Sequence, residues 1–146
     1  MEIKKILENT SNFVTKRLIE LFGALILILS IFLLISLLSY YPEDPNFIFP
    51  KNTKINNILG FRGSIVSDLF FQSIGLVSIL VSITFIITGI NIIRTKKLIL
   101  ILQNPFYLIL YVILGSLFFA VYYPESFLLN IHGNGGFVGK QLSKTF

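Results

Sequence analysis

The chain has 146 residues, of which 54% are hydrophobic and only 13% are charged, whereas soluble domains carry about 25% charged residues. This composition excludes an ordinary soluble protein, the absence of cysteine excludes disulfides and thiolate chemistry, and His132 as the sole histidine cannot form a metal site alone. The net charge of +5 comes from Lys and Arg residues that flank hydrophobic runs, a distribution typical of membrane orientation rather than of nucleic-acid binding.

Three hydrophobic runs are each long enough to cross a bilayer. They comprise residues 21–39, 69–93 and 98–123, and none contains a charged side chain. A helix needs about 20 apolar residues to cross the ~30 Å hydrocarbon core, and only a helix satisfies its backbone hydrogen bonds there. The first run is too long for the apolar core of a signal peptide and lacks a small-residue cleavage site, so we interpret it as a retained span. We therefore predict an all-α membrane protein, a polytopic helical bundle.

The third run contains a proline that bears on where its helix begins. Asn104 is a suitable N-cap and Pro105 is favoured at the first helical position, which predicts a helix from Pro105 to Tyr123. Residues 98–103 then either lie at the interface or extend the helix with a kink.

Basic residues and tyrosines orient these runs. The N-terminal segment and the link Arg-Thr-Lys-Lys between the second and third runs are rich in basic residues, which favours a cytoplasmic side for both. Tyrosine pairs at the outer ends of the first and third runs fit an aromatic belt. The predicted topology comprises a cytoplasmic N-terminal segment (residues 1–17), a first span (18–41), a periplasmic loop (42–63), a second span (64–93), a cytoplasmic link (94–97), a third span (98–123), and a periplasmic loop with the start of a fourth span (124–146).

A glycine-rich stretch near the C-terminus, NIHGNGGFVGKQLS at residues 130–143, is similar to the phosphate-binding loop of nucleotide-driven motors. That loop requires G-x-x-x-x-G-K-[ST], but here Asn134 occupies the first glycine position and Gln141 follows Lys140. Because both ends of the pattern fail, the sequence argues against a nucleotide site.

An internal repeat gives the stretch another interpretation. Tyr-Tyr-Pro-Glu closes both the first and the third run, and NILGFRGSIVSDL at residues 57–69 aligns without gaps with NIHGNGGFVGKQL at residues 130–142. This order of signals indicates a duplicated helical hairpin. In the first copy the glycines turn the chain back toward the membrane, with Ser64 as the helix cap. The second copy is then the lead-in to a fourth span beyond Phe146. The aligned pairs are Asn57/Asn130, Ile58/Ile131, Gly60/Gly133, Gly63/Gly136 and Leu69/Leu142.

Few polar residues lie within the runs. Asp68 is near the start of the second run with no obvious partner, and an acid in the first turn of a helix is favoured by the macrodipole. We prefer this structural interpretation to a role as a proton or ion ligand. No relay is expected among the remaining polar residues, which lie near span ends: Gln72, Asn91, Gln103 and Asn104.

Small residues in the second run follow the helical period. Such residues let helices approach closely in lipid, where the hydrophobic drive for association is missing. We predict a helix-packing face formed by Gly75, Ser78, Ser82 and Gly89. The sequence predicts no catalytic, cofactor-binding or metal-binding residue.

Two motifs surround the first loop. The first run ends in S-Y-x-P-x-D-P-x-F, and the second opens with glycines and serines followed by Asp-Leu. Together they resemble the N-terminal four-span membrane domain of the FtsK/SpoIIIE DNA translocases, over roughly residues 15–146. The residues that carry the resemblance are Ser39, Tyr40, Pro42, Asp44, Pro45, Phe47, Gly60, Gly63, Ser64, Ser67, Asp68, Leu69, Phe70 and Gly75.

The resemblance implies a membrane anchor for an ATP-driven motor. In that family the anchor sits in the bacterial inner membrane with a cytoplasmic N-terminus, and a hexameric motor moves double-stranded DNA through the division septum during cell division and chromosome segregation. ATP, magnesium and DNA would bind the motor, so this segment is not expected to be an enzyme. Its expected partners are the lipid bilayer, other division proteins at the septum and further copies of itself.

The alternative is a small stand-alone membrane protein, such as a channel, a holin or a transporter fragment. Three hydrophobic runs with basic flanks fit that class generically. The lack of charge within the runs and the specific loop motifs argue against it.

Overall fold

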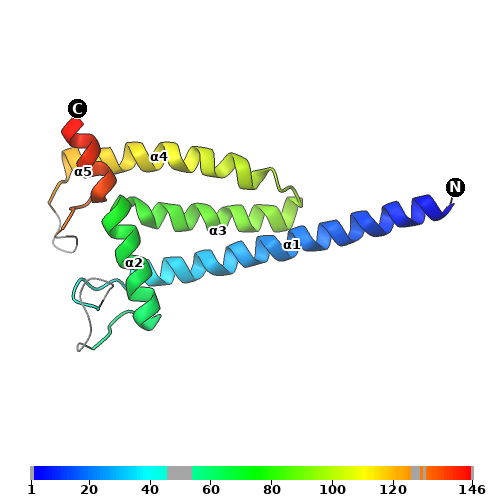
Figure 1. Ribbon diagram of the computed structural model, residues 1–146, viewed down its shortest axis with the longest axis horizontal. Coiled ribbons are helices and arrows are strands. Elements are labelled where there is room, and N and C mark those ends of the chain that lie inside the picture. Colours follow the sequence, from blue (N-terminus) through cyan, green and yellow to red (C-terminus); the bar gives the residue numbers. More distant parts are fainter. Residues whose placement is uncertain (1, 46–53, 126–128, 130, 146) are drawn as a thin grey trace.

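The computed structural model describes residues 2–45, 54–125, 129 and 131–145, and these residues form helices and connecting turns without any strand (Figure 1). The all-α prediction is therefore confirmed. In chain order the helices are α1 (Glu2–Leu38), α2 (Gly60–Ile74), α3 (Val77–Thr95), α4 (Leu100–Tyr122) and α5 (Gly136–Thr145).

Within the part of the chain that the structure describes, three segments are long and apolar enough to cross a membrane, namely Thr10–Leu38 of α1, Val77–Thr95 of α3 and Gln103–Tyr122 of α4. They lie side by side, with α3 between α1 and α4 (Figure 1). The short α2 and α5 lie across one end of this bundle, which we call the α2/α5 end. The opposite end carries the connection between α3 and α4, and we call it the link end. The predicted three-span bundle is confirmed.

The first helix is longer than the span it contains. It has 37 residues, which corresponds to about 55 Å at 1.5 Å per residue, whereas the hydrocarbon core is only ~30 Å thick. Its N-terminal region projects well past the link end of the bundle (Figure 1). The N-terminal segment that was predicted to be cytoplasmic, residues 1–17, thus largely continues the spanning helix.

The structure differs from the single helix predicted over residues 64–93. Gly75, with φ of +65°, ends α2, and α3 begins two residues later at Val77. A positive φ is readily available to glycine and rarely to other residues, so the chain turns here within an unbroken apolar run. Consequently α2 lies across the end of the bundle, and α3 alone forms the second span (Figure 1).

The third span keeps its proline inside the helix. Helix α4 begins at Leu100 and continues through Pro105, so the residues before the proline extend the helix. Asn104 is not a cap. Its side-chain amide donates to the Thr88 hydroxyl of α3 over 2.6 Å, a contact between spans where the sequence indicated no polar relay.

Small and polar side chains fill much of the interior. Large apolar residues are instead exposed around the spans, as expected where lipid surrounds them. A compact apolar cluster of Leu37, Phe71 and Leu129 lies toward the α2/α5 end. Several buried hydroxyls donate to carbonyls of their own helix, as Ser67 does to Gly63 over 2.9 Å. The buried serines and threonine are Ser30, Ser36, Ser64, Ser67, Ser78, Ser82, Thr88 and Ser116.

Candidate functional site

The motif residues singled out in the sequence gather at the α2/α5 end, where the loop after α1 meets the start of α2. Asp44 is almost fully buried, and its two carboxylate oxygens accept hydrogen bonds from the backbone amides of Asn56 and Asn57, each at 2.8 Å. The carboxylate therefore closes the loop by joining its two ends. Phe47, which also belongs to the motif, lies outside the described residues.

Asn57 ties the end of α1 to this closed loop. Its side-chain amide donates to the carbonyl of Ser36 in the last turn of α1 at 2.9 Å, and to the carbonyl of Ser39 just past the helix at 3.2 Å. Its side-chain oxygen accepts from the amide of Leu59 at 3.0 Å, an Asx turn that leads into α2. One buried asparagine thus connects α1, the loop and α2.

Two serines and a glycine complete the junction. Ser64 was expected to cap the helix, but that expectation is wrong, because α2 begins at Gly60 and has no side-chain cap. The Ser64 hydroxyl instead donates to the Pro45 carbonyl over 2.8 Å, and the Ser36 hydroxyl donates to the Gly63 carbonyl over 2.6 Å. A Cβ atom on Gly63 would collide with the Asn57 side chain. The glycine is therefore required by close packing.

Asp68 has partners that the sequence did not indicate. The Tyr40 hydroxyl donates to its carboxylate over 3.3 Å, and the Gln72 amide donates to the same oxygen over 3.4 Å. Burial, followed by the negative charge of Asp68, raises the pKa of Tyr40 to about 12. Tyr40 also packs on Phe71, with ring centroids 4.9 Å apart. Tyr40 stays protonated at neutral pH, so the arrangement holds the carboxylate in place and offers no base from the tyrosine.

A second contact, which we call the glycine interlock, joins α5 to the break between α2 and α3. It consists of Gly75, Leu76, Asn134 and Gly136. The amide of Leu76 donates to the Asn134 carbonyl over 2.9 Å. Gly75 and Gly136 both have φ of +65°, a Cβ on Gly75 would collide with the Asn134 carbonyl, and a Cβ on Gly136 would collide with the backbone nitrogen of Gly75. The interlock therefore depends on backbones in direct contact.

The structure indicates a different register for the internal repeat from the one that the gap-free sequence alignment gave. Both α2 and α5 begin at a glycine with positive φ, Gly60 at +66° and Gly136 at +65°. These glycines open the similar segments Gly-Phe-Arg-Gly and Gly-Phe-Val-Gly. The structure thus pairs Gly60 with Gly136 and Gly63 with Gly139, three residues away from the gap-free alignment, in which Asn130 lies outside the described residues. The shared G-F-x-G pattern was the signal in the sequence.

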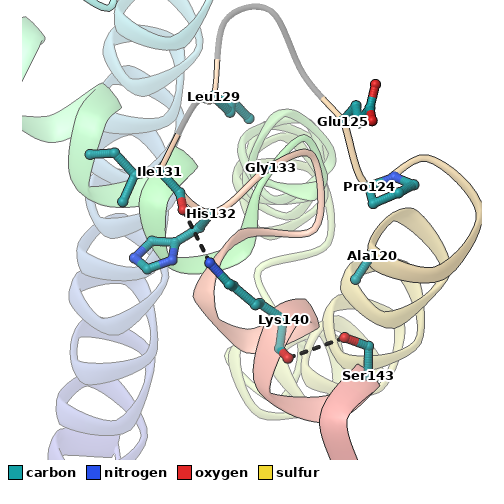
Figure 2. A pocket seen from close by; sticks show the side chains of 9 residues that line it. All are labelled: Ala120, Pro124, Glu125, Leu129, Ile131, His132, Gly133, Lys140 and Ser143. Atoms are coloured by element: carbon teal, nitrogen blue, oxygen red, sulfur yellow. Dashed lines mark hydrogen bonds between the residues drawn. The ribbon is translucent and has the colours of Figure 1, made fainter.

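The glycine-rich stretch near the C-terminus forms turns and the start of α5. Figure 2 shows the adjoining pocket of about 420 Å³, with Lys140 directed toward the Ile131 carbonyl, to which its ammonium group donates over 3.3 Å. The amides of Gly133, Gly136 and Gly139 donate to carbonyls within the chain at 2.8, 3.1 and 3.1 Å. A phosphate-binding loop presents such amides to its ligand, so this geometry favours a turn.

His132 lines that pocket beside Lys140 (Figure 2). Partial burial, followed by the positive charge of Lys140, lowers its pKa from the usual value. The ring stands edge-on to Phe137, with centroids 5.7 Å apart. The side chain is therefore neutral at pH 7 and packs the turn against α5.

The predicted packing face divides between two contacts. Gly89 meets α1, because a Cβ there would lie 2.9 Å from the Leu27 nitrogen and 3.0 Å from the Gly23 carbonyl oxygen. Since α1 and α3 run antiparallel, a shift of seven residues along both helices brings Ser82 opposite Ser30, and both are buried. Ser78 is buried one turn further on, whereas Gly75 belongs to the glycine interlock.

A family model described as the 4TM region of DNA translocase FtsK/SpoIIIE matches residues 15–146. No curated protein and no solved structure matches the chain. The matched region runs from the spanning segment of α1 to α5. It therefore includes the glycine interlock and the contact of Asp44 and Asn57 with the end of α1 and the start of α2, which we call the loop junction.

Proposed function

The chain belongs to the family defined by the 4TM region of the DNA translocases FtsK/SpoIIIE, and from that membership we propose that it anchors a motor for double-stranded DNA at the division septum. Three helices able to span a membrane supply the anchor. The match over residues 15–146 is the observation that carries the proposal, since the motor, its DNA and the septum enter through the family alone.

The proposed orientation places the link end on the cytoplasmic side of a bacterial inner membrane. Short segments rich in Lys and Arg remain on the cytoplasmic side during insertion. Basic residues lie in both segments at this end, the N-terminal half of α1 and the connection between α3 and α4. They are Lys16, Arg17, Arg94, Lys96 and Lys97. The α2/α5 end then faces the periplasm.

In this arrangement the α2/α5 end contacts other division proteins. The loop junction and the glycine interlock give α2 and α5 fixed positions there, so they can present a constant surface. Phe61 and Ile58 near the start of α2, and Phe137 in α5, expose apolar side chains at this end. Such residues serve as anchors in protein interfaces.

ATP and magnesium are assigned to the motor rather than to this segment. We expect the purified chain neither to hydrolyse ATP nor to bind duplex DNA specifically, because the amides of the glycine-rich stretch already donate within the chain. Equilibrium binding of ATP and of a labelled DNA duplex measures this. Saturable ATP binding that is lost in Lys140→Ala would contradict it.

Localisation in dividing bacteria tests the proposed function. A fluorescent fusion of the full-length gene, and one of residues 1–146, are expected at the septum. The stand-alone alternative predicts uniform membrane fluorescence together with ion or solute flux through vesicles that contain the purified chain. Uniform fluorescence of both fusions with measurable flux would overturn the anchor.

A further inference from the structure

An apolar groove lies at the link end, between α1 and the start of α4. It has a volume of about 550 Å³, within the range of about 300–1,000 Å³ usual for ligand sites. Its α1 residues follow the i, i+3, i+4, i+7 spacing of a single helix face. Apart from one hydroxyl, the lining is hydrocarbon. The lining residues are Thr15, Leu18, Ile19, Phe22, Leu98 and Ile101.

The two segments that line the groove also contain basic residues. Residues 15–22 and 94–101 together hold five basic residues and one acid, Glu20. Glu20 accepts from Arg17 at 2.6 Å and from Lys96 at 2.7 Å, so its charge is already shared by two partners. Among the described side chains, Lys16 and Lys97 form no ion pair, and both are exposed. The two segments that line the groove therefore carry positive charge, next in sequence to Thr15 and Leu98, that no described ion pair neutralises.

The groove lies beside the connection between α3 and α4, and a connection between two spanning helices lies at a membrane surface. Helix α3 ends at Thr95, and helix α4 begins at Leu100. Leu98 lies in the connection between these two spanning helices, and Ile101 lies in the first turn of α4. Leu18 and Phe22 reach the same level from α1 and are 61% and 46% exposed. At this depth lipid is present at a far higher concentration than any protein segment.

From these observations we propose that the groove binds an anionic phospholipid. One acyl chain lies against Leu18, Phe22 and Leu98, and the head-group phosphate is held by Lys16 and Lys97. Basic pockets beside membrane-spanning helices recognise anionic head groups through their net negative charge. A zwitterionic lipid offers the same chain but no net charge, so charge is what selects the occupant.

A single tryptophan reports on this occupant, because the chain contains none of its own. Phe22→Trp places the reporter in the groove of the full chain. The protein is reconstituted in phosphatidylcholine vesicles that contain a small fraction of lipid with brominated chains, which quench tryptophan on contact. We expect brominated phosphatidylglycerol to quench at least about threefold more than the same fraction of brominated phosphatidylcholine. Leu18→Trp provides a second reporter on the same face.

Matched variants separate a site from general attraction to the surface. Adding Lys16→Gln and Lys97→Gln should bring the quenching ratio close to one while leaving quenching by phosphatidylcholine unchanged. Lys140→Gln with Lys144→Gln removes the same charge at the α2/α5 end and should leave the ratio intact. A reporter at Phe118→Trp, an exposed position on α4 away from the groove, should show no preference.

Two results would overturn the proposal. One is equal quenching by the two brominated lipids at both groove reporters. The other is a preference for phosphatidylglycerol that persists when Lys16 and Lys97 are neutralised. Neither result depends on a motor or a septum, so the anchoring proposal would be unaffected.

Discussion

The first hairpin, α1 followed by α2, and the second, α4 followed by α5, share the order of a long helix and a short one. They differ in the contacts that hold the two helices together. In the first, the buried Asp44 and Asn57 side chains join the end of α1, the loop and α2 through hydrogen bonds. In the second, the Asn134 side chain donates to the carbonyls of Tyr123 at 3.0 Å and Glu125 at 2.9 Å, just past the end of α4. Glycine backbones in close contact hold this hairpin as well, since a Cβ atom on Gly135 or Gly139 would collide with the Ser116 carbonyl of α4.

This difference indicates which changes each hairpin tolerates. A junction made of buried side chains is weakened when a partner is removed, because the groups left behind lose their hydrogen bonds. A junction made of close backbones is weakened when a side chain is added, because backbone atoms cannot move aside cheaply. The first copy is therefore sensitive to removal of the Asp44 or Asn57 side chain, in addition to its close packing at Gly63, whereas the second is sensitive chiefly to an added side chain.

The largest expected effect is at the glycine interlock. Gly75→Ala adds a Cβ that collides with the Asn134 carbonyl, and it also places alanine at a φ of +65°. We expect a loss of more than about 3 kcal/mol in unfolding free energy, from backbone strain and steric overlap together. Steric-trap unfolding in bicelles measures this.

Gly60→Ala is the matched control for the interlock. It has nearly the same φ, +66°, but nothing lies within 4 Å of the added Cβ. It should therefore cost only the backbone term, about 1–2 kcal/mol. Equal losses at the two glycines would show that conformation alone, and not contact between the hairpins, accounts for Gly75.

The second largest expected effect comes from a substitution that weakens the first hairpin. Asp44→Ala leaves the buried amide of Asn57 and the partly buried amide of Asn56 without their acceptor, which we expect to cost about 2–3 kcal/mol in unfolding free energy. Glu43→Ala, at the neighbouring position, should have little effect. Asn134→Ala in the second hairpin should cost less, about 1 kcal/mol, because its partners are exposed. A larger loss from Asn134→Ala than from Asp44→Ala would reverse the comparison.

A third prediction concerns the contact between α1 and α3, which supports both hairpins. Ser78→Leu with Ser82→Leu places large side chains at two positions that are 0% exposed, and overpacking of this kind costs about 1–3 kcal/mol. Ile83→Leu with Ile87→Leu, at exposed positions of the same helix, should be nearly neutral. Leucine inserts readily, so membrane insertion should be unchanged for both pairs.

In the full-length gene, the serine pair should weaken septal placement more than it weakens ATP hydrolysis by the detached motor. Fluorescent fusions of both pairs measure the placement. Equal septal recruitment of the serine variant, the isoleucine variant and the unchanged protein would show that the packing face is not needed for septal placement.

The smallest expected effect is a pH dependence confined to the second hairpin. Because burial and Lys140 lower the pKa of His132 in the fold, the unfolded segment binds a proton more tightly than the folded one. The contribution of His132 to stability is therefore complete above its unfolded pKa, about 6.5, and declines as the pH falls below it. Hydrogen exchange of α5 amides should accelerate at pH 5 relative to pH 7.5, after correction for intrinsic rates.

Replacement of His132 by Gln should abolish this acceleration, while amides at the start of α2 serve as an internal reference. An acceleration of equal size in α2, or one that persists in His132→Gln, would mean that another group is responsible.

Several features were predictable from the sequence because they depend on local properties. The number of spans follows from the lengths of the apolar runs, whereas the predicted helix start at Pro105 was wrong, because α4 begins at Leu100. The family followed from the residues around Asp44 and Asp68, whose order along the chain is itself the signal. Side-chain chemistry and spacing suffice for such inferences.

Other features depended on partners far apart in the chain. The break at Gly75 was hidden within an apolar run, since its contact is the backbone of Asn134. Asp68 looked isolated because Tyr40 precedes it by 28 residues. The register of the repeat shifted by three residues because α5 begins at Gly136 and not at Gly133, although both glycines have a positive φ.

The sequence by itself determined that this chain is a helical membrane protein of the FtsK/SpoIIIE family, because hydrophobic length and short motifs are properties of neighbouring residues. Only the tertiary structure decided that α2 and α5 lie across one end of the bundle and interlock there. The physical reason is that glycine permits several backbone paths. Contact with a distant backbone selects one of them, and no single segment contains that information.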